Sequence, residues 1–169
     1  AHLGAAEIDL LIQIRELKKL ELLYCEIEPE TFARLSELSI SESIRFFGTE
    51  ASAEQRDDLS EALEGIEIVY GRGGFLGVVS DDPNVASVGE IMPGSAADKA
   101  GLVQGDRITK VNGVEIITFD DMRMELAKYA ADETIEVEFK RRDYSIGGNR
   151  EQQNQWIDMS TSVTLGQQE

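Results

Sequence analysis

Apolar residues alternate with polar ones in three short runs in the first part of the chain. The runs are centred on Leu20, Ile44 and Ile66, which lie 24 and then 22 residues apart, and in each run the residue two positions on is also apolar. Alternation with a period of two predicts a short strand with one buried face. Between the runs, residues 29–38 and 53–63 place apolar side chains at helical spacing, which predicts a helix after each of the first two strands.

The first run carries a fuller motif, which also specifies the turn after the strand. Its residues are Leu17-x-x-Leu20-x-Leu22-x-x-Cys25-x-Ile27. They resemble the template of a leucine-rich repeat at every specified position, and the second and third runs resemble it loosely. We therefore interpret residues 1–73 as the C-terminal portion of a leucine-rich-repeat array, the alternative being a helical region with short strands. In this interpretation a small or polar residue caps the bend after each strand: Cys25, Thr49 and Gly71.

If these strands stack in parallel, residues at equal positions form columns on the face turned away from the helices. One column is charged with alternating sign, which neighbouring strands favour. The next is apolar, and an apolar column on an otherwise charged face suggests a contact with the second part of the chain or with a partner protein. Ordinary exposure is the remaining alternative. The charged column consists of Glu21, Arg45 and Glu67, and the apolar column, a possible second interface, of Leu23, Phe47 and Val69.

Three runs punctuated by glycine dominate the second part of the chain. In the first, residues 74–78, apolar side chains surround a glycine, which favours a loop whose backbone N–H groups gather to bind an anion such as a terminal carboxylate. The second, residues 93–102, predicts a turn and a short helix capped by Ser95. The third predicts a strand over residues 107–111, closed by the Asn112-Gly113 turn. We further expect strands over 78–80, 88–92, 135–139 and 156–165, a helix from Thr118 or Asp120 to about Tyr129, and a polar loop or hairpin tip over 143–155.

In this order and spacing the three runs resemble a PDZ domain, closest to the bacterial class found beside HtrA-type proteases. The resemblance covers residues 74–142, with 162–166 as a possible last strand. It implies a mainly-β, partly open barrel with two helices. The expected fold is therefore α/β leucine-rich-repeat units over residues 1–73, followed over residues 74–169 by a PDZ-like domain with a C-terminal hairpin extension.

The resemblance also implies a peptide site. The backbone N–H groups of Leu76, Gly77 and Val78 would hold a C-terminal carboxylate, and the strand that follows would offer its open edge to an added peptide strand. Many eukaryotic members begin the second helix with a histidine that selects a hydroxyl; Phe119 stands at the matching position, so an apolar preference is expected. These side chains could equally be ordinary core residues around a blocked groove. The complete expected set is Phe75, Leu76, Gly77, Val78, Val79, Ser80, Phe119, Arg123 and Leu126.

Composition narrows the function further. The chain has 33 acidic and 16 basic residues and a formal net charge of −17, which disfavours nucleic acid and anionic membranes as partners. One cysteine and one histidine leave no internal disulfide, no cysteine-cluster zinc site and almost nothing from which to build a Ser-His-Asp hydrolase. No helix with the required glycine spacing follows the glycines before residue 77, so a dinucleotide site is disfavoured.

We therefore expect a binding module and not an enzyme. It would bind protein C-termini or extended segments, without a cofactor or a metal. The alternative is the regulatory, substrate-recognition part of a larger protease whose catalytic domain lies elsewhere. No apolar run approaches the length of a membrane span, and the N-terminal residues lack the pattern of a signal peptide; we expect a soluble protein, with its compartment and oligomeric state left open.

Overall fold

A computed structural model describes residues 1–143 and 155–166 of the chain. It divides into two compact units, Ala1–Gly73 and Gly74–Glu169, which are described separately. The expected polar loop over 143–155 lies almost wholly outside the described residues.

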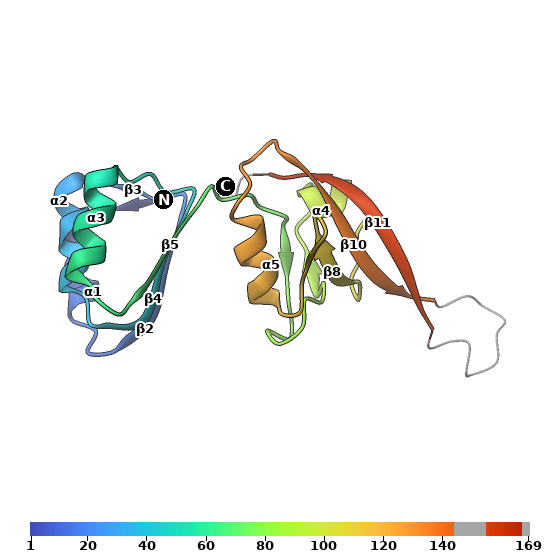
Figure 1. Cartoon of the computed structure of the whole chain (residues 1–169), viewed down its shortest axis with the longest axis horizontal. Coiled ribbons are helices and arrows are strands. Elements are labelled where there is room, and N and C mark those ends of the chain that lie inside the picture. The colour runs from blue at the N-terminus through green and yellow to red at the C-terminus, as the bar shows by residue number, and fades with distance from the viewer. Residues whose placement is uncertain (144–154, 167–169) are drawn as a thin grey trace. The chain divides into compact units, whose positions relative to one another are not determined.

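The first unit is built on a parallel sheet of three strands in the order β2-β4-β5. The helices between the strands lie on one face of this sheet (Figure 1). The two-residue strands β1 and β3 pair with each other. In chain order the elements are β1 (His2–Leu3), α1 (Ala5–Ile12), β2 (Leu17–Leu23), β3 (Glu26–Ile27), α2 (Pro29–Ala33), the short 3-10 helix η1 (Arg34–Glu37), β4 (Ile40–Phe47), α3 (Ala53–Ala62) and β5 (Glu67–Gly71).

The third strand lies two residues further along the chain than the sequence pattern predicts. Leu20 pairs with Ile44 and Ile44 with Ile68, so the structural period is 24 residues at both steps and Ile66 is not the third member. The turn at the end of α3 explains the difference. It continues through Gly65, whose φ is +86°, to Ile66, whose N–H still donates to the Leu63 carbonyl at 3.1 Å.

The shift also corrects the expected columns on the other face of the sheet. In the strand register Arg45 lies opposite Glu21 on one side and opposite Val69, not Glu67, on the other. Its guanidinium still reaches the carboxylates of Glu21 at 3.4 Å and of Glu67 at 3.9 Å. Phe47 pairs with Leu23 and with Gly71. Leu22, Ile44 and Phe46 belong to the core as predicted. Burial does not alternate along β4, however, because Ser43, Arg45 and Phe47 on the other face are buried too. The alignment of β5 against β4 also differs from the prediction.

Aromatic stacking ties the helices of the first unit to its sheet. The ring of Phe32 on α2 lies 5.3 Å from that of Phe46 on β4, which in turn lies 4.9 Å from that of Tyr70 on β5. At the bend after β4 the Thr49 hydroxyl accepts from the Cys25 N–H at 3.0 Å and donates to the Leu22 carbonyl at 3.1 Å. The Thr49 side chain thus caps the neighbouring turn after β2, and not the bend after its own strand as expected. Within the described residues the parallel sheet ends at three strands, and no leucine-rich-repeat solenoid is shown.

The second unit contains two antiparallel sheets, one of four strands in the order β11-β10-β8-β9 and one of two, β6-β7. Isolated bridges extend the pairing between Phe75 and Gly166 and between Ser87 and Arg107, but the described strands do not form a closed barrel. In chain order the elements are β6 (Val78–Val79), β7 (Glu90–Ile91), α4 (Ala96–Lys99), β8 (Arg107–Val111), β9 (Val114–Glu115), α5 (Phe119–Leu126), β10 (Thr134–Arg142) and β11 (Trp156–Thr164).

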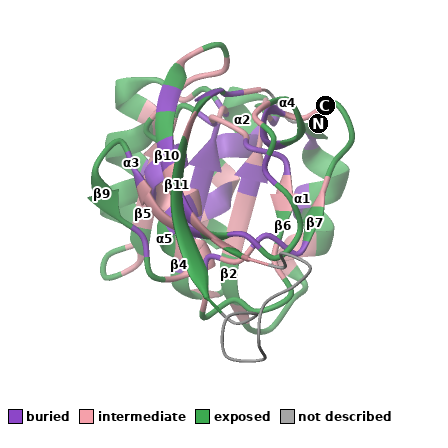
Figure 2. Ribbon diagram, turned by 90° about the vertical axis from the view of Figure 1, so that its right-hand side faces the viewer, coloured by how far each residue is buried: buried purple, intermediate pink, exposed green. Residues whose placement is uncertain are grey.

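The core of the second unit lies between its strands and α5. Met122 and Leu126 on α5 pack with Ile108, Val137 and other buried side chains of the four-stranded sheet. The hairpin of β10 and β11 continues past this core, so β11 is coloured almost wholly as exposed in Figure 2. The strand over 107–111 has the predicted bounds, whereas β6, β7 and α5 are shorter than predicted and β10 is longer.

Candidate functional site

Two hydrogen bonds hold α5 beside the segment that contains β6. At one end the Gly74 N–H donates to the Tyr129 carbonyl, just beyond the last turn of α5, at 2.7 Å. At the other end the Phe119 N–H, on the first turn of α5, donates to the Pro83 carbonyl at 3.3 Å. The chain from Gly74 to Pro83 therefore runs antiparallel to α5, with β6 between the two anchor points.

Gly77 fixes the loop that leads into β6. Its φ is +81°, and a Cβ built on it would lie 2.2 Å from the Ser95 Cβ. The Gly77 carbonyl accepts from the Met92 N–H at 2.9 Å and from the Ser95 hydroxyl at 3.4 Å. Glycine is needed here because the backbone is left-handed and because the space is taken by Ser95, the residue that caps α4. The need for glycine at position 77 thus comes from the backbone conformation and from Ser95, whereas the resemblance implies a ligand that approaches the backbone closely.

The opposite edge of β6 has no strand against it in the part of the chain that the structure describes. Gly77 and Val79 direct their carbonyls to the β7 side, where they accept from Met92 and Gly89. Backbone groups of successive strand residues point to alternate edges, so those of Val78 point to the unpaired one. Before the strand, the N–H groups of Leu76 and Gly77 donate to no group within the described residues. The loop therefore offers free donors next to a free strand edge.

The expected side chains fall into buried, half-buried and exposed groups around this edge. Leu76 and Leu126 are buried members of the core, and Val78 and Phe119 pack half-buried against it. Val79 is 50% exposed, so it adds nothing to the core. Phe75 exchanges two backbone hydrogen bonds with Gly166, at 3.0 and 2.9 Å. The expected side chains that remain partly exposed here, those of Val78, Val79 and Phe119, are therefore apolar.

Two expected polar residues are already engaged inside the protein. The Ser80 hydroxyl donates to the Asp82 carbonyl at 2.8 Å and lies 3.3 Å from the Ser87 hydroxyl. Arg123 is half-buried on α5 and interacts with other residues of the protein. Both side chains therefore already have partners within the protein.

Sequence reasoning missed the residues that hold the site together. Ser95 was expected only as a helix cap, yet it also blocks the position above Gly77 and donates to its carbonyl. Tyr129 was expected only as the approximate end of the second helix, but its backbone carbonyl anchors Gly74. The Pro-Gly turn before Ser95 was the one available signal, because it places the cap of α4 at a sharp bend.

The N-terminus of α5 is held by a reciprocal cap. The Thr118 hydroxyl accepts from the Asp121 N–H at 3.0 Å, and the Asp121 carboxylate accepts from the Thr118 N–H at 2.8 Å. The hydrogen bonds that the carboxylate accepts from Thr118, with a further one from the Ile117 N–H, lower the pKa of the Asp121 carboxyl below its ordinary value. The helix that flanks β6 therefore starts at a defined residue.

The possible second interface of the first unit comes together only in part. Leu23 and Phe47 are neighbours on β2 and β4, while Val69 lies beside Arg45. Among the described residues there is no group of three side chains arranged to bind a metal ion, and no helix has both the length and the apolar character needed to cross a bilayer.

A hollow of about 530 Å³ adjoins the loop on the side of the Phe75–Gly166 bridge. Its lining includes residues 92–96 and 164–166, together with Lys99 and Asp132. Neither Val78 nor any residue of α5 lines it. It is therefore separate from the edge of β6.

Known proteins resemble the second half of this chain. Residues 87–141 match the family model of the PDZ domain. The protease RseP of Yersinia pestis is 59% identical over 39 residues, 22% of this chain and 9% of the relative. A probable periplasmic serine protease (do/HhoA-like) of Haemophilus influenzae is 43% identical over 56 residues, 33% of this chain and 12% of the relative. The matches thus span about a tenth of each relative.

The crystal structure of a serine endoprotease from Yersinia pestis is similar with a TM-score of 0.42 and 18% identity, over 57% of this chain and 29% of that one. The assignment rests on the sequence matches and on the anchored loop, edge strand and helix described above. Residues 87–141 of the second unit thus match the PDZ family, and this match supports a protein-interaction module.

Proposed function

We propose that the second unit binds extended peptide segments, above all protein C-termini, as an added strand along the free edge of β6. The observation that carries this proposal is the free edge of Val78 beside the unpaired N–H groups of Leu76 and Gly77. A peptide strand would gain main-chain hydrogen bonds from the edge. Its terminal carboxylate would accept from the loop amides, which form charge-assisted hydrogen bonds.

The ligand would carry an apolar last residue. Val78 and Phe119 are half-buried and pack against the core that includes Leu76 and Leu126. Burying an apolar side chain of the peptide there would remove it from water at no polar cost. Phe119 also lacks a group that would select a hydroxyl on the ligand.

Peptide chemistry tests the two contacts separately. A library of peptides with apolar C-termini would be measured by fluorescence polarisation as free acids, as C-terminal amides and with one backbone nitrogen methylated. We expect the amide to weaken binding through the lost carboxylate and the methylated backbone to weaken it through the lost strand bond. Equal binding of acid and amide would refute carboxylate capture.

A pair of variants places the binding on α5. Phe119→Ala removes a half-buried side chain from the helix beside β6, whereas Ile117→Ala removes a side chain that is 61% exposed, two residues earlier and outside the helix. We expect the first variant to bind the best peptide of the library more weakly and the second to bind it as the parent protein does. Equal effects would argue against the proposed location.

A second candidate role is the substrate-recognition part of a larger protease. It is favoured by one specific observation, namely that the relatives matched by this PDZ domain are themselves proteases. The reading frame around this chain tests it. A protease segment in the same protein would support this role, and further repeats alone would support an adaptor.

The first unit would serve as a scaffold or as a second interaction surface, as the end of a leucine-rich-repeat array. The 24-residue period, the parallel strands and the hydroxyl cap of Thr49 support this assignment. Upstream sequence with the same period would extend the array. Its absence from the full reading frame would count against a repeat array.

A further inference from the structure

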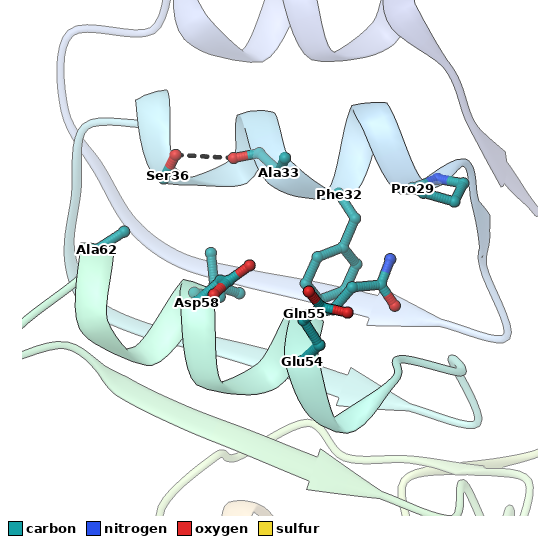
Figure 3. Close-up of a pocket in the computed structure, with 9 residues that line it drawn as sticks. Pro29, Phe32, Ala33, Ser36, Glu54, Gln55, Asp58 and Ala62 are labelled. Atoms are coloured by element: carbon teal, nitrogen blue, oxygen red, sulfur yellow. Dashed lines mark hydrogen bonds between the residues drawn. The ribbon is translucent and has the colours of Figure 1, made fainter.

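The helices of the first unit leave a groove between them. One wall is formed by α2 and η1 and the other by α3, and the groove encloses about 290 Å³. Figure 3 shows Phe32 pointing from α2 toward α3, with Glu54, Gln55 and Asp58 around it. The lining residues of the second wall, Glu54, Gln55, Asp58, Leu59 and Ala62, recur at the spacing of a single helix face.

The groove stays open because short side chains face one another across it. Ala33 and Ser36 line one wall and Ala62 the other, so none of them reaches the opposite helix. The Ser36 hydroxyl of η1 donates to the carbonyl of Ala33, the last residue of α2, at 2.7 Å. Phe32 and Leu59 are buried below, which gives the groove an apolar floor.

The rim of the groove is acidic. Glu54 and Asp58 are exposed and one helical turn apart on α3, an arrangement of like charges that is unfavourable by itself. Within the described residues neither carboxylate has an ion-pair partner. The Gln55 amide oxygen is engaged, because it accepts from the Ser52 N–H at 2.8 Å. The rim therefore keeps two carboxylates without an ion-pair partner among the described residues, although Glu54 lies in the first turn of α3, where the helix dipole favours an acid.

The cations nearby are committed to other contacts. The Arg56 guanidinium lies 4.6 Å above the ring of Tyr70 and donates to the Ala51 carbonyl at 3.1 Å. Arg34 pairs with Asp9 at 2.8 Å and with Glu37 at 3.2 Å. The groove thus has an apolar floor and an anionic rim, and none of the described residues that line it is a lysine or an arginine.

We propose that this groove binds a basic protein segment by accepting one of its lysine or arginine side chains. Such a side chain has an apolar stem and a charged head, which match the floor at Phe32 and Leu59 and the rim at Glu54 and Asp58. The volume lies at the lower limit of small-molecule sites, so it suits a single anchoring side chain. The net charge of −17 attracts a cationic partner over a longer range.

The whole chain can be tested with a defined probe. The probe is an alanine-based helical peptide with one central arginine, acetylated at its N-terminus and amidated at its C-terminus. Because it has no terminal carboxylate, it cannot bind through one to the loop at Gly77. Titration is followed by amide chemical shifts, and we expect those of Ala33, Gln55 and Ala62 to move. Citrulline in place of arginine keeps the shape but removes the charge, and should weaken binding roughly tenfold. Equal binding of the two peptides would overturn the proposal.

Matched variants separate the groove from the overall charge. Glu54→Gln with Asp58→Asn removes two acids from the rim, whereas Asp57→Asn with Glu61→Gln removes two acids at the same spacing from positions of α3 that do not line the groove. We expect roughly a tenfold loss for the first pair and less than about a twofold loss for the second. Equal losses would show bulk attraction only and would refute the site.

A third variant fills the groove without changing its charge. Ala62→Leu places a larger side chain on a lining position of α3. We expect it to abolish the chemical-shift changes while the rest of the spectrum keeps its dispersion. Undiminished binding to this variant would contradict the proposed position of the arginine stem. None of these outcomes depends on the peptide site of the second unit.

Discussion

The guanidinium of Arg141 donates two hydrogen bonds to the carboxylate of Asp106. Nε lies 2.8 Å from Oδ1 and Nη2 lies 2.8 Å from Oδ2. Asp106 is 0% exposed and also accepts from the Val103 N–H at 2.9 Å, while Arg141 reaches on to the Gly101 carbonyl. This pair therefore joins the turn before β8 to the far part of β10, and its loss should be felt throughout the second unit.

The two halves of this pair should not be equally sensitive to substitution. Arg141→Met leaves a fully buried carboxylate without its cation, which we expect to cost about 3–5 kcal/mol. Asp106→Asn keeps a hydrogen-bonding side chain beside Val103, and the Arg141 side chain is 29% exposed and can turn to water. We therefore expect a smaller cost, about 1.5–3 kcal/mol, which is typical of hydrogen bonds to a charged group. Urea unfolding followed by the fluorescence of Trp156, the only tryptophan, measures both.

The neighbouring surface pair is the control for this experiment. Lys140 lies 3.6 Å from Asp158, with both side chains largely exposed. Because exposed pairs contribute little, Asp158→Asn should change the free energy of unfolding by less than about 1 kcal/mol. A loss as large as that of Arg141→Met would show that charge on the hairpin, and not burial, controls stability.

Gly77 should tolerate no side chain. Gly77→Ala must place a Cβ 2.2 Å from the Ser95 Cβ in a left-handed backbone, so we expect a loss of stability well above the roughly 1–2 kcal/mol of the backbone alone. Gly94→Ala is the control, since its φ is +76° but its Cβ would meet open space. The free energy of unfolding of both variants would again be measured with urea. Similar losses would show that backbone strain, and not contact with Ser95, causes the destabilisation.

The sequence located the elements of the second unit better than their connections. The strand over 107–111 was predicted with its correct bounds, because alternation defines its start and the Asn112-Gly113 turn its end. By contrast, Asp106 and Arg141 are 35 residues apart, and no local pattern pairs one acid among 33 with one cation among 16. The same holds for Ser95 over Gly77, a contact made only by the folded chain.

The displaced third strand shows a different limit of sequence reasoning. Ile66 and Ile68 alternate as well as Ile68 and Tyr70 do, so a period of two cannot choose between the two alignments. The choice is made by the turn at Gly65 and by stacking of Tyr70 on Phe46. At the site, periodicity likewise could not show that Leu76 and Leu126 are buried in the core while Val78 and Phe119 remain partly exposed.

The cap of α5 should respond to acid. Because hydrogen bonds from Thr118 lower the pKa of Asp121 in the folded protein, its charged form stabilises the fold above the unfolded pKa of about 3.9. This contribution is lost as the pH falls through the lower, folded pKa. Asp121→Asn should therefore reduce stability at neutral pH, and the difference from the parent should shrink in acid. A carboxyl resonance of Asp121 that titrates at or above the ordinary value would contradict this.

The Thr49 hydroxyl should control how often the first unit opens, and Cys25 can report it. Burial raises the pKa of the Cys25 thiol, so both access and thiolate formation favour alkylation after opening. Thr49→Val removes the hydroxyl that accepts from the Cys25 N–H and donates to the Leu22 carbonyl. We expect the loss to cost about 1–3 kcal/mol. Alkylation by iodoacetamide should then accelerate roughly 5- to 150-fold. Ser36→Ala, which removes a more exposed hydroxyl, is the control; equal acceleration in both variants would rule out the proposed cap.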